Sequence, residues 1–188
     1  MFLIVGLGNV GDKYKYNIHN AGFIFADILQ NRMNFQWSDK FKSSYGVFSH
    51  GGSKVFVQKP STYMNSSGEA VLAIQSFYKI QPQNIIVVHD DIDLKDGDIR
   101  IKCGGGHGGH NGLRSIDAMI GSGYWRVRVG TGRPENKSDV ANFVLGDFKR
   151  DSLENIVRKY HCVIDNLDML LGLNEDKSCQ GKLLNVLL

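Results

Sequence analysis

The sequence lacks any apolar segment long enough to cross a membrane. Its longest apolar runs, such as Phe2–Val5, have the length of a strand, whereas a membrane-spanning helix needs about 20 apolar residues. A basic leader followed by a long apolar stretch is also missing. We therefore expect a soluble protein that works in the cytoplasm and not at a membrane.

Cysteine is scarce. The chain has three cysteines, Cys103, Cys162 and Cys179, and no two of them form a CxxC pair. An odd number without close pairs argues against a disulfide framework and against a zinc site built on cysteine. We expect free thiols in a reducing compartment.

A strong charge of either sign is missing too, because the formal net charge is only +3. Total charge therefore identifies no partner, but its distribution is more informative, since residues 98–137 contain seven basic and three acidic side chains. A basic sector of this kind favours a phosphate-bearing partner. A solvated charged surface explains the same charges equally well.

What the chain does contain is enough apolar sequence for one core. It has 188 residues, 42% of them hydrophobic, and no shift in composition, so we expect residues 1–188 to form a single domain. Apolar or alternating runs predict strands at 2–5, 45–50, 54–58, 84–88, 98–102 and 124–129. Helical spacing predicts helices after Asn20 and at 70–77, 113–120, 138–145 and 152–172. This order predicts one three-layer α/β/α domain with a twisted, mostly parallel mixed sheet and a cleft at the carboxyl ends of the strands.

The least ordinary stretch is rich in glycine. Five of the seven residues from Gly104 to His110 are glycine, and His107 and His110 lie among them. Glycine in such density opposes folding unless the backbone makes unusual turns or lets a ligand approach closely. Asn111 follows where a helix would be capped, so backbone N–H groups and the positive end of a helix would face any ligand here. A merely flexible loop is the alternative.

Several polar residues stand at strand or helix ends. His19 is expected at a helix N-terminus, where the helix dipole disfavours imidazolium and so suits a neutral base. Asp90 follows the predicted strand 84–88 and could orient a histidine ring, bind a cation, or simply belong to an exposed acidic loop. Asn9 ends the first strand, and Asn65 precedes the capping-box spacing Ser66–Glu69, so a capping role alone would also explain Asn65.

Two strands are expected to present basic pairs. Alternation in the strand 98–102 places Arg100 and Lys102 on one face, and alternation in 124–129 places Arg126 and Arg128 together. Pleat geometry therefore aligns four cations near the glycine-rich loop. Such an arrangement would contact phosphates without reading bases.

At the level of motifs the chain resembles the bacterial peptidyl-tRNA hydrolase family. The matching blocks run in family order over roughly positions 4–146: Ile4–Asn9, His19–Gly22, Lys59–Asn65, His89-Asp90, Gly104–Gly112, Arg128–Gly130 and Val144–Gly146. The resemblance implies an esterase that separates a peptide from the 3′-terminal ribose of tRNA in peptidyl-tRNA released from ribosomes. It also implies a cytoplasmic monomer without a metal or other cofactor.

The resemblance also assigns roles to particular residues. His19 matches the general base, Asp90 the carboxylate that orients it, and Asn9 the residue that discriminates peptidyl from free aminoacyl substrates. Asn65, a candidate for the oxyanion contact, and Asn111 match amides that hold the peptide and the ribose. The remaining matches line the cleft around the 3′ CCA end or clamp acceptor-stem phosphate: Tyr14, Tyr63, Met64, Gly108 and His110 for the cleft, and Lys102 and Arg128 for the clamp.

Two departures and one rival class qualify this interpretation. Val10 stands where the family usually has proline, which would loosen the loop that holds Asn9, and Asp91 stands where glutamate is common, which we expect to matter little. The rival is a metal-dependent hydrolase acting on a phosphate-bearing substrate, for which a set of six candidate ligands exists: His19, His89, Asp90, Asp93, His107 and His110. A non-catalytic RNA-binding module is a third possibility, although it would leave His19 and Asp90 without a role.

Overall fold

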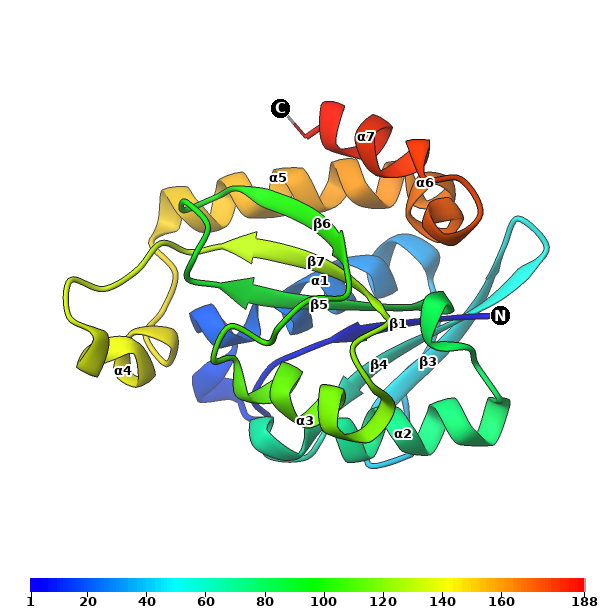
Figure 1. The fold of residues 1–188 in the computed structure, drawn as a ribbon, viewed down its shortest axis with the longest axis horizontal. Helices are drawn as coiled ribbons and strands as arrows, with labels where there is room; N and C mark the ends of the chain where they lie inside the picture. The colour runs from blue at the N-terminus through cyan, green and yellow to red at the C-terminus, as the bar shows by residue number, and fades with distance from the viewer. Residues whose placement is uncertain (188) are drawn as a thin grey trace.

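The computed structural model describes residues 1–187, and a mixed sheet of seven strands forms its centre. The strands are ordered β2-β3-β4-β1-β5-β7-β6. Neighbouring strands β4, β1, β5 and β7 run parallel, while β2, β3 and β6 pair antiparallel at the two edges (Figure 1). Their bounds are β1 Phe2–Gly6, β2 Ser38–Lys40, β3 Ser43–His50, β4 Ser53–Pro60, β5 Ile85–Asp91, β6 Ile99–Cys103 and β7 Trp125–Gly130.

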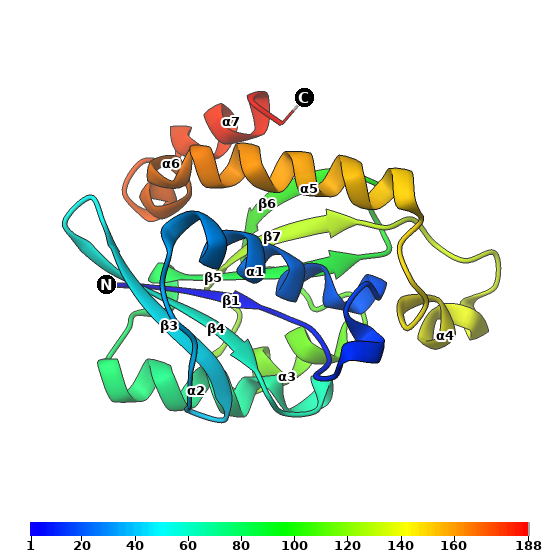
Figure 2. The ribbon, with the colours of Figure 1, turned by 180° about the vertical axis from the view of Figure 1, so that it is seen from behind.

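Helices cover both faces of this sheet. Helices α1 and α5 lie on one face and α2 and α3 on the other, whereas α4 projects beyond the end of the sheet (Figures 1 and 2). The predicted three-layer α/β arrangement with a mixed sheet is therefore confirmed. The helix bounds are α1 Ala21–Met33, α2 Ser67–Tyr78, α3 Asn111–Ile120, α4 Val140–Val144, α5 Arg150–Asp165, α6 Leu167–Leu171 and α7 Ser178–Asn185.

Strand β1 shows why the central strands are continuously apolar. Ile4 packs into the core beneath α1 and α5, while Leu3 and Val5 pack into the core on the side of α2 and α3. A strand buried on both faces needs apolar residues at successive positions, unlike a strand with one wet face. This places the carboxyl end of β1 in the interior of the sheet, between β4 and β5.

The predicted helix at 152–172 is not continuous, so this prediction is wrong. Helix α5 ends at Asp165 and α6 begins at Leu167, with Asn166 between them at φ −111 and ψ 36. The Asn166 side chain donates to the Cys162 carbonyl at 2.8 Å, which stabilises the break. The apolar spacing in the sequence continues across this break because Ile164 and Leu170 pack into the same core, so the spacing alone does not reveal the break.

The predicted capping box at Ser66–Glu69 is also absent, because the Ser66 side chain makes no capping hydrogen bond. Instead, the Gly68 N–H donates to Ser115 Oγ of α3 at 2.9 Å. A neighbouring helix therefore satisfies the first turn of α2. Near the end of the chain, α7 reaches the free edge of the sheet at β6 through a 2.6 Å hydrogen bond from Gln180 to the Ile101 carbonyl.

None of the helices within residues 1–187 combines the length and the apolarity that crossing a membrane requires.

Candidate active site

The site forms where the carboxyl ends of β1 and β5 meet the N-termini of α1 and α3. His19 lies in a 3₁₀ turn, Ile18–Asn20, directly before α1. This turn comes close to the sheet because Gly22 has no side chain: a Cβ there would lie 2.2 Å from the Leu7 nitrogen and 2.3 Å from the Val88 oxygen. Gly22 therefore allows the start of α1 to sit directly on β1 and β5.

His19 and Asp90 are in contact, as the sequence interpretation requires. Nδ1 of His19 lies 2.9 Å from Oδ1 and 3.0 Å from Oδ2 of Asp90, and both side chains are buried. An ionised carboxylate only accepts hydrogen bonds, so Nδ1 carries the proton. The lone pair of His19 is thus on Nε2, on the far side of the ring from Asp90.

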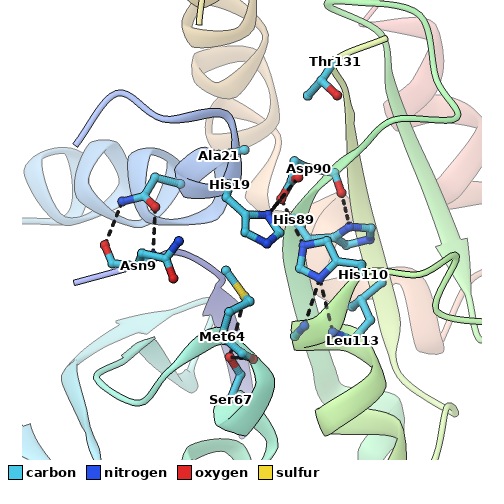
Figure 3. Close-up of polar contacts among 12 residues, drawn as sticks. Asn9, His19, Ala21, Met64, Ser67, His89, Asp90, His110, Leu113 and Thr131 are labelled. Carbon is cyan, nitrogen blue, oxygen red and sulfur yellow. Dashed lines mark hydrogen bonds and ion pairs between the residues drawn. The ribbon is translucent and has the colours of Figure 1, made fainter. Parts of the chain in front are cut away.

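His110 is a second partner of Asp90. Its Nε2 lies 3.0 Å from Asp90 Oδ1, while its Nδ1 accepts from the Gly112 and Leu113 N–H groups at 3.1 and 3.4 Å (Figure 3). These bonds fix the tautomer, with the proton on Nε2. They also correct the prediction that Asn111 caps this helix, because His110 is the N-cap of α3 and Asn111 is its first residue.

A third histidine completes the surroundings of Asp90. His89 Nδ1 donates to the backbone carbonyl of Asp90 at 2.7 Å, and its ring meets that of His110 edge-on at 5.3 Å between centroids. Burial, followed by the electrostatic influence of the neighbouring His110 ring, lowers the pKa of His89 to about 3. His89 is therefore neutral under physiological conditions.

Asp90 itself remains ionised. Burial alone would raise the pKa of Asp90, but the electrostatic influence of the neighbouring His110 and His19 rings and the hydrogen bonds from both rings hold it below its ordinary value. A buried carboxylate with two N–H donors suits a site that must stabilise a protonated histidine.

A cavity of about 580 Å³ opens beside this network. The glycine-rich loop forms one side of it, and α4 forms the other with Val140, Ala141 and Val144. Five of the predicted site residues line it: His19, Asp90, Gly108, His110 and Asn111.

The basic strands border a smaller cavity of about 90 Å³, which Lys102 and Arg128 line. The strand register places Lys102 opposite Arg126 and Arg100 opposite Arg128, so the four cations do share one face. Gly108 lines both cavities. The phosphate-binding candidates and the histidine network therefore lie on two sides of one loop.

Arg126, however, does not present a free charge, and this part of the prediction is wrong. It is 3% exposed and donates to the carbonyls of Gly105 and Gly106 and to Asp117. The sequence pattern gave its face correctly but could not reveal that the glycine-rich loop folds back over it.

Arg128 is also paired, because its Nε donates to Asp91 Oδ2 at 2.8 Å. We expected the aspartate at position 91 to matter little, yet it holds one of the two candidate phosphate ligands. Lys102 is exposed.

The remaining predicted residues are more dispersed. Asn9 lines a separate cavity of about 300 Å³. Met64 is buried against α3, where a Cβ on Gly112 would lie 2.7 Å from its sulfur, and Tyr63 is 85% exposed beside an open hollow of about 380 Å³. Tyr14 and Asn65 line none of these four cavities.

Only three of the six candidate ligands of the rival metal-dependent hydrolase lie close together in the part of the chain that the structure describes. Within residues 1–187, the potential ligand atoms of His19, Asp90 and His110 lie within 4.8 Å of one another. The other three have different partners: His89 bonds the Asp90 backbone, Asp93 pairs with Arg133, and His107 Nδ1 accepts from the Gly109 N–H.

Fold and site together define an α/β enzyme with a buried histidine–carboxylate pair, an arrangement suited to moving a proton at a hydrolytic centre. Comparison with known proteins is more specific. The sequence model of the family described as Peptidyl-tRNA hydrolase matches residues 3–183. The chain therefore belongs to the peptidyl-tRNA hydrolase family, and the predicted family and enzyme class are confirmed.

Individual relatives agree with this assignment. The chain is 51% identical over 164 residues to a peptidyl-tRNA hydrolase of Aliarcobacter butzleri, covering 83% of this chain and 84% of the relative. It is 44% identical over 173 residues to that of Rickettsia felis, covering 91% and 94%. Among solved structures, the peptidyl-tRNA hydrolase of Acinetobacter baumannii aligns with a TM-score of 0.90 at 35% identity, over 100% of this chain and 94% of that one.

Proposed function

We propose that this protein hydrolyses the ester bond between a peptide and the 3′-terminal ribose of tRNA, with His19 as the general base. The contact between His19 Nδ1 and Asp90 is the observation that carries the proposal. Nε2 takes a proton from water as the water oxygen attacks the ester carbonyl. The imidazolium that forms keeps its Nδ1 proton in the hydrogen bond to Asp90, whose charge stabilises it. When the bond between the carbonyl carbon and the 3′ oxygen breaks, the Nε2 proton passes to that oxygen, which releases the tRNA and leaves His19 neutral again.

The negative charge that develops on the carbonyl oxygen needs hydrogen-bond donors, and we propose that side-chain amides supply them. At the start of α3, the Gly112 and Leu113 N–H groups already donate to His110. The helix end therefore has fewer N–H groups free for an oxyanion than an uncapped helix would have. We assign this role to Asn65, which with Asn111 holds the peptide and ribose end of the substrate, while Asn9 discriminates peptidyl from free aminoacyl substrates.

The rest of the substrate extends on both sides of the glycine-rich loop. Tyr14, Tyr63 and Met64 would contact the peptide and the 3′ CCA end, together with Gly108 and His110. Lys102 and Arg128 would bind acceptor-stem phosphate, because they share a small cavity with that loop. We propose that the protein acts on this substrate as a monomer in the cytoplasm.

Replacing Lys102 with alanine should weaken tRNA binding and reduce its salt dependence. Removing one phosphate contact lowers the slope of log K against log salt concentration by about 0.7–0.9. Binding of uncharged tRNA at a series of salt concentrations measures this slope. Lys54→Ala is a matched control, since Lys54 is exposed at the start of β4, outside the cavities described. An unchanged slope in Lys102→Ala would remove Lys102 from the phosphate site.

Hydrolysis of peptidyl-tRNA should survive removal of divalent cations. The proposed mechanism uses Nδ1 of His19 and Nε2 of His110 as donors to Asp90, so neither nitrogen is left to bind a metal. Rates are compared before and after dialysis against a strong chelator. Activity that disappears and returns with a divalent ion would instead favour the metal-dependent hydrolase, for which the convergence of His19, Asp90 and His110 is the supporting observation.

A further inference from the structure

Asn20 holds the backbone of Asn9 from both sides. Its Oδ1 accepts from the Asn9 N–H at 2.8 Å, and its Nδ2 donates to the Asn9 carbonyl at 3.0 Å. Asn20 is 2% exposed, so water competes little for these bonds. Both bonds on Asn9 are drawn in Figure 3.

The loop that follows β1 depends on this contact. Leu7 is the last residue tied to the framework, since its N–H donates to the Val88 carbonyl and its own carbonyl accepts from Phe23. Among the hydrogen bonds of residues 1–187, the backbone of residues 8–10 makes only the two with Asn20. Val10 is 57% exposed, so packing holds it weakly.

The contact also decides which amide is available to a ligand. The side chain of Asn20 uses its oxygen and its nitrogen on Asn9. The side-chain amide of Asn9 has no partner within residues 1–187 and keeps both a donor and an acceptor. Asn20 is therefore buried and bonded to Asn9 through both polar atoms, whereas the Asn9 amide is the one left available.

Asn20 directly follows His19 in the same 3₁₀ turn. That turn thus carries the base and, through Asn20, the anchor of the loop that presents Asn9. Displacing a substrate-positioning group by about 1 Å can cost roughly 10²-fold in rate. A short rigid link between base and anchor avoids such displacement.

We propose that Asn20 is a positioning residue that fixes the Asn9 amide relative to His19 and so sets the preference for peptidyl over free aminoacyl esters. This rests on the proposed function and on the role of Asn9 in it. A peptidyl ester presents a neutral peptide group next to the ester, which matches both the donor and the acceptor of an amide. A free aminoacyl ester presents an ammonium there, which leaves the amide donor unpaired.

The test compares hydrolysis of N-acetylaminoacyl-tRNA and of the same aminoacyl-tRNA with a free amino group. Asn20→Leu keeps the size of the side chain but loses both hydrogen bonds, and we expect the ratio of the two kcat/KM values to fall at least about tenfold. Asn20→Ala removes the same bonds without bulk and serves if the leucine variant does not fold. A ratio that stays at the wild-type value in a folded variant overturns the proposal.

Asn17→Ala is the matched control, because Asn17 directly precedes the turn Ile18–Asn20. Asn17 is also buried, but its side chain donates to the Leu145 carbonyl and to Asp147, so its loss should lower stability and leave the ratio unchanged. An equal fall of the ratio in Asn17→Ala would mean that any loosening of the turn suffices and would overturn a specific role for Asn20. Asn9→Ala separates the two proposals: if it abolishes the preference and Asn20→Leu does not, only the inference about Asn20 fails.

Discussion

His19→Ala is expected to lower kcat/KM for peptidyl-tRNA by about 10²–10⁴, the usual contribution of a general base. Alanine removes the only nitrogen that we assign to take a proton from water, while Asp90 keeps its bond from His110. The local structure should therefore survive the change. Release of the N-acetylamino acid from N-acetylaminoacyl-tRNA measures the rate, and thermal unfolding checks that the variant is folded.

His50→Ala is a suitable control for this experiment. His50 ends β3 and pairs with Asp168, away from the cavity beside Asp90. An exposed pair of this kind contributes little to stability, so its loss should leave both folding and rate nearly unchanged. If His19→Ala retained activity within tenfold of the wild type, another group would have to be the base.

Asp90→Asn is the second change with a large expected effect. Asparagine preserves the shape of the side chain but removes the negative charge that faces the imidazolium in the transition state. In the serine-protease triad the corresponding change lowers kcat by about 10⁴, and we expect a loss of about 10²–10⁴ here. A variant with near wild-type kcat would show that the carboxylate charge has no part in the reaction.

Asp90→Asn should also change how the free energy of unfolding depends on pH. The pKa of Asp90 in the folded protein lies below its ordinary value, so the carboxylate stabilises the fold at neutral pH. This stabilisation is complete above about pH 4, the range of an unfolded aspartate, and is lost as the pH falls toward the lower pKa of the folded state. The difference in unfolding free energy between wild type and Asp90→Asn should therefore be present at pH 7 and shrink at pH 3. A difference that grows on acidification would contradict an ionised Asp90.

The location of this site, but not the roles of its residues, could be predicted from periodicity. Apolar runs located β1 and β5, and the rule that ligands bind at the carboxyl ends of parallel strands brought Asn9 and Asp90 to the same region. The pairing of His19 with Asp90, in contrast, came from the resemblance to the peptidyl-tRNA hydrolase family, because position alone left Asp90 equally suited to binding a cation or to an exposed acidic loop. Alternation also gave the shared face of Lys102 and Arg128 correctly.

What the sequence could not give were contacts decided by a distant partner. Asparagine is the better N-cap by local preference, yet His110 caps α3 because its other ring nitrogen binds Asp90 on β5. Likewise Ser115 of α3, and not the local Ser66, satisfies the first turn of α2. The anchoring role of Asn20 had a local signal, its position next to His19, but only the fold shows which backbone it reaches.

The contacts of Arg126 reduce the conformational entropy that the glycine-rich loop can lose when a ligand binds. A segment with five glycines in seven residues would normally lose much conformational freedom when a ligand orders it. The buried guanidinium donates hydrogen bonds to two successive carbonyls of that segment, so part of this freedom is already lost when the chain folds. A ligand that binds at this loop therefore finds a partly preorganised backbone. Less conformational entropy is lost on binding than a fully mobile loop would lose, so the affinity is reduced less.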